Sequence, residues 1–403
     1  MTKLVQINSA INKGSTGKIA EQIGRIAKGK GWESYVAHTS RYANETVLTD
    51  ISTSCAFEEK THYLGSLLFD GQGRYSSAST SKLVNRLDTI RPDVIHVHNI
   101  HGYFLNYKIL FDYIRTAHIP VVWTLHDCWP FTGHCVYFDR IGCEKWKRGC
   151  HDCPQKDTYP KSLIDRSVKN FKRKKECFTS IEDLTIVPVS EWLGGLVKES
   201  FWGNYPIHTI HNGIDLDKFK PCESDFRKKH DLEDKFIALG VADGYGKRKG
   251  IPDFNKLSER FGDDVKIVMV GLSESDMKQV GPNILGMART SSQQELIDIY
   301  SAADVFINPT YEDNFPTTNL EALACGTPVI TYATGGSPEA IDEHTGIVVN
   351  KGDVEEMYQA IELVRKNGKS SYSSVCRERA LNCFNKDDRF EDYFRLYEEI
   401  LSK

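Results

Sequence analysis

The sequence lacks any hydrophobic run long enough to cross a lipid bilayer. No stretch of its 403 residues approaches the roughly 20 apolar residues that a membrane-spanning helix needs. The first residues, 1–9, also lack the charged, long apolar and small-residue regions of a secretory signal. From these two absences we expect a cytoplasmic protein.

A strong charge of either sign is absent as well. The formal net charge is −4, and charged residues make up 26% of the chain. Domains that bind nucleic acid usually carry a basic face and a high pI, so this composition indicates no nucleic-acid partner. Internal repeats and low-complexity tracts are missing too, which excludes repeat architectures and disordered chains.

The length and the hydrophobic pattern predict two α/β domains. A chain of 403 residues exceeds what one hydrophobic core usually supports. Short apolar runs alternate with helical patterns in both halves, which predicts parallel strands joined by helices. Glycine, asparagine and proline between 203 and 206 separate the two series. We therefore expect domains at 1–202 and 203–384, followed by an amphipathic helix over 385–403 that packs back across them.

The expected elements are short strands and longer helices in alternation. The strands are expected at residues 4–7, 94–97, 121–125, 185–189, 236–241, 265–270, 305–307, 328–331 and 347–349. The helices are expected at residues 19–27, 107–114, 191–200, 292–301 and 353–364.

The most informative stretch covers residues 311–329 and follows a predicted strand. A turn that contains proline leads into a helix beginning near Thr317 or Thr318, where free backbone N–H groups and the positive helix end coincide. Such a helix end suits a phosphate group. Asp313 precedes the helix and Glu321 lies inside it, so the two carboxylates can bind different parts of one ligand.

Two glycine-rich loops add to this pattern. Residues 239–251 form a predicted strand that leads into a loop with Arg248 and Lys249. A departing diphosphate develops negative charge, which fixed cations and N–H groups can stabilise; the alternative is a solvated basic loop. Residues 12–18 follow the first strand, and two glycines there allow close approach of a ligand. This second loop is not a Walker A motif, because Asn12 stands where that motif requires glycine.

Histidines follow two neighbouring predicted strands. His126 and Asp127 end one apolar strand, and His98 ends the preceding one. Ligands collect at the carboxyl ends of strands in open parallel sheets. His96 and His98 share one face of their strand, which is compatible with a metal site. We favour packing at the strand end or a lining of an acceptor site.

These motifs resemble the donor-site signature of the retaining glycosyltransferases of family 4. Glu321 corresponds to the second of two glutamates in that signature, and Asp313 stands in place of the first. Lys249 matches the family's lysine before a glycine, whereas Gly244 stands where the family has an arginine, so Arg248 is the substitute. Within the family, the chain resembles enzymes of bacterial capsule and colanic-acid-type polysaccharides.

The resemblance implies the GT-B fold, in which two Rossmann-like, doubly wound α/β domains face a central cleft. It also implies transfer of a hexosyl or N-acetylhexosaminyl group from a UDP- or GDP-linked sugar, with retention of configuration and without a catalytic metal. The acceptor would be a saccharide or a lipid-linked saccharide of a surface polysaccharide. Two alternatives remain, a nucleotide-sugar epimerase or hydrolase of similar fold and a catalytically silent donor-binding subunit.

The resemblance assigns roles to residues in both halves. His126, Lys249 and Asp313 are the expected catalytic residues. The expected donor-binding residues are Gly14, Ser15, Thr16, Gly17, Arg248, Lys249, Phe315, Pro316, Thr317, Thr318, Asn319 and Glu321. The expected acceptor-side residues are His98, Asn99 and Asp127.

Two further features lie in the first half. Cys135, Cys143, Cys150 and Cys153, within the cysteine-rich loop 128–160, end in the C-x2-C pattern of half a zinc site. A structural zinc and four reduced thiols are both open. The basic run Lys169–Lys175 would hold the protein transiently against an anionic membrane, at the inner face of the plasma membrane. A solvated helix face is the alternative.

Overall fold

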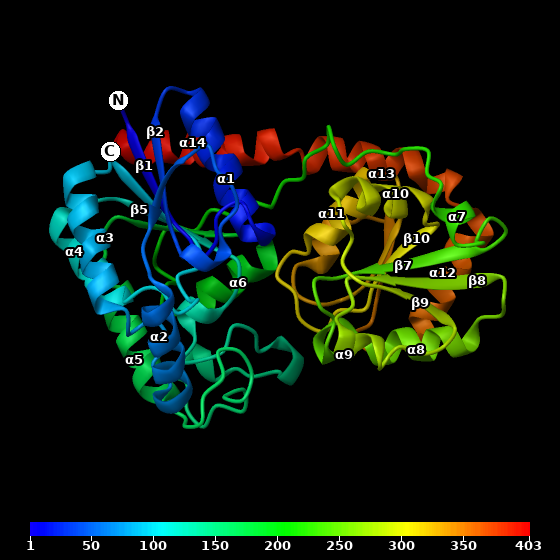
Figure 1. The fold of residues 1–403 in the computed structure, drawn as a ribbon, viewed down its shortest axis with the longest axis horizontal. Coiled ribbons are helices and arrows are strands. Elements are labelled where there is room, and N and C mark those ends of the chain that lie inside the picture. Colours follow the sequence, from blue (N-terminus) through cyan, green and yellow to red (C-terminus); the bar gives the residue numbers. More distant parts are fainter. The chain divides into compact units, whose positions relative to one another are not determined.

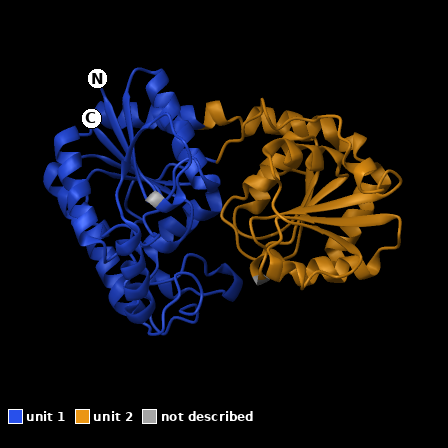
Figure 2. Ribbon diagram, viewed as in Figure 1, with its two compact units in different colours: residues 1–211, 390–403 blue, residues 212–389 orange. Residues whose placement is uncertain are grey.

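The computed structural model describes residues 1–39, 41–246 and 248–403 and separates into two compact units (Figure 2). Unit 1 comprises residues 1–211 and 390–403, and unit 2 comprises residues 212–389. Residues 203–211 therefore group with unit 1, unlike the boundary expected from the sequence. Both units contain a six-stranded parallel sheet with helices packed around it (Figure 1).

Unit 1 has the strand order β3-β2-β1-β4-β5-β6. Its strands are β1 (Lys3–Ile7), β2 (Glu33–His38), β3 (Thr49–Ser52), β4 (Val94–Val97), β5 (Val121–Leu125) and β6 (Leu184–Pro188). Its helices are α1 (Gly14–Gly29), α2 (Ala56–Phe69), α3 (Ser77–Ile90), α4 (Tyr107–Ala117), α5 (Ser167–Phe178) and α6 (Glu191–Glu199). The chain between β5 and α5 forms only short 3-10 turns, at Trp129–Phe131, Asp139–Ile141 and Lys145–Lys147.

Unit 2 has the strand order β12-β11-β10-β7-β8-β9. Its strands are β7 (Phe236–Val241), β8 (Val265–Val270), β9 (Ile284–Met287), β10 (Val305–Asn308), β11 (Val329–Tyr332) and β12 (Gly346–Val349). Its helices are α7 (Phe226–Lys229), α8 (Ile251–Arg260), α9 (Glu274–Met277), α10 (Gln293–Ala302), α11 (Thr317–Ala324), α12 (Val354–Asn367) and α13 (Ser370–Cys383). Among the helices of the described ranges, none combines the length and the apolar character needed to span a bilayer.

The two sheets share one topology. In each unit the first strand lies in the middle, the next two strands extend to one side, and the last three extend to the other. The strand order therefore reverses between β1 and β4 in unit 1, and between β7 and β10 in unit 2. In doubly wound sheets, ligands bind at the carboxyl ends of the strands at such a reversal. The expected two-domain Rossmann-like fold is confirmed.

The last helix, α14 (Lys386–Leu401), supplies part of the core of unit 1. Its side chains Phe390, Phe394 and Tyr397 are buried against residues of β1, α1, β4 and β5. The ring of Trp32 lies 5.0 Å from that of Phe394. The amphipathic pattern of the C-terminus thus has its partner surface in the first sheet, because burying an apolar helix face stabilises the helix.

Candidate active site

Lys249 and Asp313 meet at the strand reversal of unit 2. Lys249 follows β7 and Asp313 follows β10, its neighbour in the sheet. The ammonium group of Lys249 donates a hydrogen bond to the Asp313 carboxylate and forms an ion pair with it. The two side chains are only 14% and 15% exposed. The sequence predicted both residues, and the structure brings them into contact.

A glycine permits this close approach of the two loops. Gly250 has a φ of 74°, and a Cβ at this position would lie 2.5 Å from the backbone oxygen of Pro309. A side chain would therefore be strained and would also push the two loops apart. Arg248 links the same loops, because its guanidinium donates to Glu312 O at 2.8 Å and its backbone oxygen accepts from Tyr311 N at 2.9 Å.

Two opposing effects act on the pKa of the Lys249 side chain. Burial lowers the pKa of the Lys249 ammonium group, while the carboxylate of Asp313 acts in the opposite direction. A buried cation that has lost water needs an anionic partner. Asp313 is that anionic partner in the structure. An anionic ligand could also pair with the Lys249 ammonium group.

The start of α11 lies on the loop that follows β10. Its N-cap residue is Pro316, whose side chain accepts no hydrogen bond from the first N–H groups of the helix. The side chain of Asn319 is fully buried and bonds to Asn308 at 2.9 Å and to Ser337 at 3.0 Å. These bonds fix the helix start to the end of β10 and to the loop after β11. An anion is favoured at such a helix start.

Glu321 lies one turn further along α11. Its Oε2 accepts a hydrogen bond of 2.9 Å from the hydroxyl of Tyr300, on α10. Phe315, which is 4% exposed, packs with its ring 5.9 Å from that of Phe384. Sequence reasoning missed the supporting residue Tyr300, because only the packing of α10 against α11 reveals it.

The first glycine-rich loop connects β1 to α1 in unit 1. Asn12 and Gly14 have φ angles of 47° and 65°, in the left-handed region. A Cβ at Gly17 would lie 3.3 Å from the backbone of Ala10, and Asn12 N donates to Gly17 O at 3.0 Å. Helix α1 begins at Gly14 without a side-chain cap, so its first turn includes the expected donor-binding residues Ser15 and Thr16.

His126 belongs to a chain of buried and partly buried hydrogen bonds at the ends of β4 and β5. Nε2 of His126 lies 3.2 Å from Nδ1 of His98, and Nε2 of His98 lies 3.1 Å from Oε1 of Gln6. The Gln6 amide is oriented by its NH₂ group, which donates to Ala20 O at 2.8 Å. Its oxygen therefore faces His98. Sequence reasoning missed Gln6, since nothing in the pattern of β1 distinguishes a buried amide from a surface one.

This chain fixes the tautomers of both histidines. Oε1 of Gln6 only accepts, so His98 carries its proton on Nε2. Burial lowers the pKa of His98 well below its ordinary value, so the ring is neutral and its Nδ1 accepts from His126 Nε2–H. Burial also lowers the pKa of His126, to about 4, against the opposing effect of Asp127. At neutral pH, Nδ1 of His126 is therefore an unprotonated hydrogen-bond acceptor.

Two family models match this chain and cover most of it between them. The model described as "Glycosyltransferase Family 4" matches residues 31–218, and the model described as "Glycosyl transferases group 1" matches residues 247–367. This chain belongs to the family 4 glycosyltransferases. The observed topology agrees with this assignment.

Individual proteins are similar to this chain as well. The WcaC protein of Escherichia coli (strain K12), named as a glycosyl transferase of colanic acid biosynthesis, is 25% identical over 77% of this chain and 78% of its own. The sucrose-phosphate synthase of Thermosynechococcus elongatus has a TM-score of 0.72 at 17% identity over the whole of both chains. Anabaena HepE, solved in complex with UDP, has a TM-score of 0.69 at 13% identity over 99% of this chain and 100% of its own. These two structures show that the glycosyltransferase shares their fold.

The expected acceptor-side residues of the glycosyltransferase lie at the same end of the first sheet. Asp127 accepts from His101 at 2.6 Å and from Trp129 N at 2.9 Å. Burial raises the pKa of Asp127, but His101 and the Trp129 N–H outweigh it and leave the pKa below its ordinary value. Asn99 is held through its backbone, which bonds to Ser9 N at 2.9 Å.

His96 belongs to the core. Its Nδ1 lies 2.6 Å from the hydroxyl of Tyr397, on α14, and its Nε2 lies 2.7 Å from Oγ1 of Thr124. Both ring nitrogens are therefore occupied by hydroxyl groups. This arrangement agrees with strand-end packing and leaves neither nitrogen for a metal ion.

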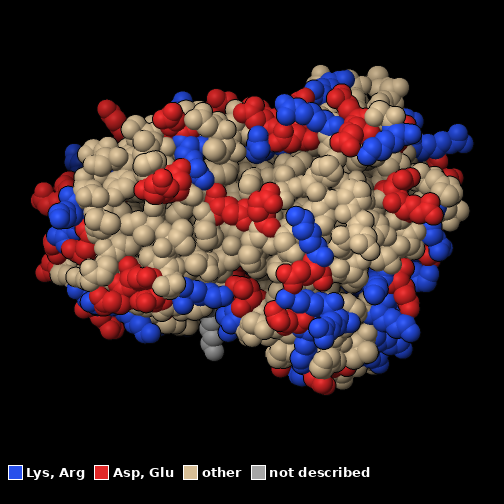
Figure 3. Space-filling view, turned by 180° about the vertical axis from the view of Figure 1, so that it is seen from behind, with Lys and Arg blue, Asp and Glu red and all other residues tan. Residues whose placement is uncertain are grey.

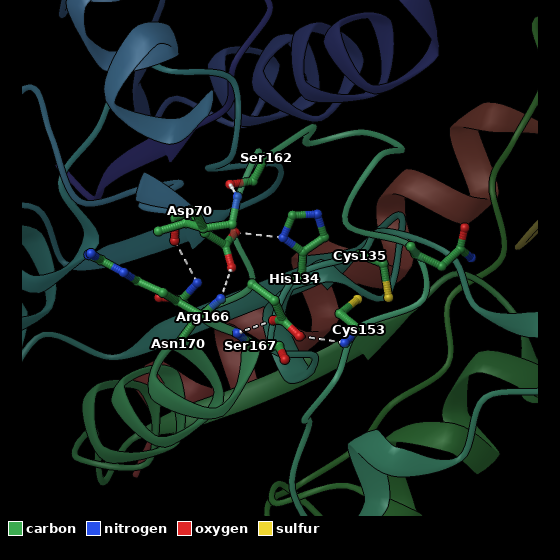
Figure 4. Close-up of polar contacts among 12 residues, drawn as sticks. Asp70, His134, Cys135, Cys153, Ser162, Arg166, Ser167 and Asn170 are labelled. Atoms are coloured by element: carbon green, nitrogen blue, oxygen red, sulfur yellow. Dashed lines mark hydrogen bonds and ion pairs between the residues drawn. The ribbon is translucent and has the colours of Figure 1, made fainter. Parts of the chain in front are cut away.

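For the cysteine-rich loop, the sequence left a structural zinc and four reduced thiols both open. Its thiols line one small cavity, yet no three His, Cys, Asp or Glu side chains in the described part of the chain are grouped to hold a metal ion. The hydrogen bond to Cys153 and burial raise the pKa of the Cys135 thiol, and burial raises that of Cys150 to about 11. The hydrogen bond with Cys135 lowers the pKa of the Cys153 thiol to about 7. Hydrogen bonds hold the loop, including those from Cys153 N and Ser167 N to Asp165, at 2.6 and 2.7 Å (Figure 4).

Proposed function

We propose that this glycosyltransferase moves a hexosyl or N-acetylhexosaminyl group from a UDP- or GDP-linked sugar to a saccharide or lipid-linked saccharide, with retention of configuration, in surface polysaccharide synthesis. The observation that carries the proposal is the buried Lys249–Asp313 pair beside the uncapped start of α11, at the strand reversal of unit 2. The name of the WcaC relative supports the pathway class, and the UDP complex of HepE supports a nucleotide-linked donor.

Lys249, Asp313 and Glu321 each have a role in the proposed donor complex. The diphosphate lies against the first N–H groups of α11 and the ammonium group of Lys249, which together stabilise its charge. Asp313 then exchanges its bond to Lys249 for bonds to the sugar hydroxyls. Glu321, oriented by Tyr300, accepts hydrogen bonds from the ribose. Phe315, Pro316, Thr317 and Thr318 shape the turn that the phosphates approach.

The proposed transfer step is a front-face displacement at the anomeric carbon. The bond between this carbon and the leaving phosphate oxygen breaks, and the acceptor oxygen bonds to the same face. The acceptor proton moves to the departing phosphate oxygen, so atoms and charge balance without a covalent enzyme intermediate. His126 contributes its Nδ1 as an acceptor for a hydroxyl of the transferred sugar, and His98, Asn99 and Asp127 lie on the acceptor side.

A direct assay tests this proposal. The purified chain is first screened by thermal shift against UDP, GDP and their sugar conjugates, because a ligand at about 100 times its dissociation constant adds about 2.7 kcal/mol of stability. The conjugate that stabilises it is then incubated with lipid-linked saccharides, and the product is examined by NMR. We expect nucleotide release that depends on the acceptor, and a product with the anomeric configuration of the donor.

Three other outcomes would contradict the proposal. Nucleotide release without any acceptor would identify a hydrolase, and conversion of the sugar itself would identify an epimerase. An inverted product would exclude the front-face step. Binding of nucleotide without turnover of any acceptor would favour the silent donor-binding subunit.

A further inference from the structure

Helix α2 presents apolar side chains to solvent. Phe57 is 76% exposed, Leu64 is 51% exposed and Leu68 is 37% exposed. These positions are seven and four residues apart, so they lie on one face of the helix. The outer face of a helix on a soluble domain is normally polar. The composition of α2 thus indicates a surface that is covered under working conditions.

A neighbouring segment extends this apolar surface. Leu163 N donates to Leu67 O at 2.7 Å, which places the segment before α5 against the last turn of α2. Leu163 and Val168 are 57% and 62% exposed, and the guanidinium of Arg166 lies 5.7 Å above the ring of Phe69. We call the combined area the α2–α5 surface, and its apolar members are Phe57, Leu64, Leu68, Phe69, Leu163, Ile164 and Val168.

Hydrogen bonds hold the two parts of this surface together. Asp70, at the end of α2, accepts from Arg166 N at 2.8 Å and bonds to His134 Nδ1 at 2.6 Å (Figure 4). The backbone oxygen of Asp70 accepts from the amide of Asn170 on α5 at 2.6 Å. Asp70 and His134 are buried, so these bonds are shielded from water. The surface is therefore a preformed part of unit 1.

Basic residues border the apolar members. Residues 161–175 contain seven lysines and arginines and a single acidic residue, Asp165. The carboxylate of Asp165 is engaged by backbone N–H groups. Lys161, Arg166 and Lys169 are exposed. Figure 3 shows Lys and Arg side chains, with Asp and Glu among them, at the lower right of the face that it draws.

One lysine of this run does not belong to the surface. Lys174 is buried, and its ammonium group donates to Trp129 O at 2.6 Å and lies 3.5 Å from the centre of the Trp129 ring. The basic run predicted from the sequence as a membrane contact therefore includes one residue that fixes α5 to the domain. The exposed basic residues of this run are Lys169, Lys172 and Lys175.

We propose that the α2–α5 surface docks on an anionic lipid bilayer. The apolar side chains enter the boundary between head groups and acyl chains, and the surrounding basic side chains bind the phosphates of the lipids. An exposed apolar patch with a basic border has the composition of an interfacial membrane site. A protein partner with the same fit would need a matching acidic border, whereas an anionic leaflet supplies negative charge over the whole area.

Vesicle sedimentation tests this proposal with the full chain. The vesicles contain phosphatidylcholine alone or phosphatidylcholine with about one third phosphatidylglycerol. One variant combines Leu64→Gln, Leu163→Gln and Val168→Gln, and another combines Lys169→Glu and Lys172→Glu. The matched controls are Leu363→Gln with Leu381→Gln, and Lys228→Glu with Lys229→Glu, all of which change exposed residues of unit 2.

We expect the wild type and both controls to bind the anionic vesicles and to be released by salt. The apolar and the basic variants should each lose about tenfold or more of this affinity. All proteins should keep the same transfer rate with a water-soluble acceptor, so a failure of docking is distinguishable from a failure of the proposed function. Equal binding by the surface variants and the controls would overturn the proposal. So would a concentration-dependent dimer in gel filtration that the apolar variant abolishes, since a second copy would then cover the surface.

Discussion

Lys249→Ala tests the donor site most directly. In the structure the Lys249 ammonium group is the side-chain cation that contacts Asp313, and its loop is bonded through Arg248 to the loop that leads to α11. Removing one fixed charge-stabilising donor from a transition state lowers the rate by about 10² to 10³, or about 2.7 to 4 kcal/mol. Because the leaving diphosphate gains charge only as the bond breaks, we expect most of the loss in kcat.

The same substitution also affects stability, and the two effects can be separated. Without Lys249 the Asp313 carboxylate, only 15% exposed, loses its ion-pair partner, which destabilises the fold by about 1 to 3 kcal/mol. The double variant Lys249→Met with Asp313→Asn removes both charges. We expect it to recover most of the stability in urea unfolding while its rate stays low.

The assay is steady-state release of nucleoside diphosphate at saturating acceptor, with Lys228→Ala as the exposed-lysine control. A Lys249→Ala enzyme within about threefold of the wild type in kcat/KM would remove this residue from the mechanism. Recovery of the rate along with stability in the double variant would show that Lys249 acts only on the fold.

Three further predictions concern the support of the site and its titration. Gly250→Ala should destabilise unit 2 by about 1 to 3 kcal/mol and weaken nucleotide binding, because the added Cβ would lie 2.5 Å from Pro309 O. The matched control in urea unfolding is Gly195→Ala, whose Cβ would meet nothing within 4 Å. Gln6→Met should free the His98 ring to exchange tautomers, which nitrogen-15 NMR of the His126 ring detects, and an unchanged His126 spectrum would contradict the hydrogen-bond chain. Stability should fall as the pH drops from 6.5, the ordinary pKa of histidine, toward 4. The reason is that His126 has a pKa of about 4 in the folded chain, so the unfolded chain binds the proton first. A Tm that stays constant over this pH range in calorimetry would refute the assignment of a neutral His126.

The strands in the middle of both sheets were predictable from the sequence. Residues 94–97, 121–125, 236–241 and 265–270 were expected as strands and form β4, β5, β7 and β8 with the same bounds. Strands covered on both faces need apolar side chains at every position, so they leave an unbroken signal. The strands β2, β3 and β9 were missed. Strand β2 mixes polar with apolar residues, and the edge strands β3 and β9 are only partly buried.

The sequence by itself determined the fold class, the family and the candidate chemistry of individual loops. Glycine-rich turns after strands, a helix start after the loop at 309–316 and a histidine at a strand end are local features, and local features are readable from neighbouring residues. The start of α11 at Thr317 was predicted on that basis.

Only the tertiary structure decided which of these residues act together. Lys249 meets Asp313 across 64 positions, Tyr397 meets His96 across 301, and Gln6 fixes the tautomer of His98 across 92. It also decided that Lys174 is buried and that the apolar face of α2 is exposed. Such pairings depend on strand order and on how helices pack, and the free energies behind them come from many distant residues at once, so no local pattern encodes them.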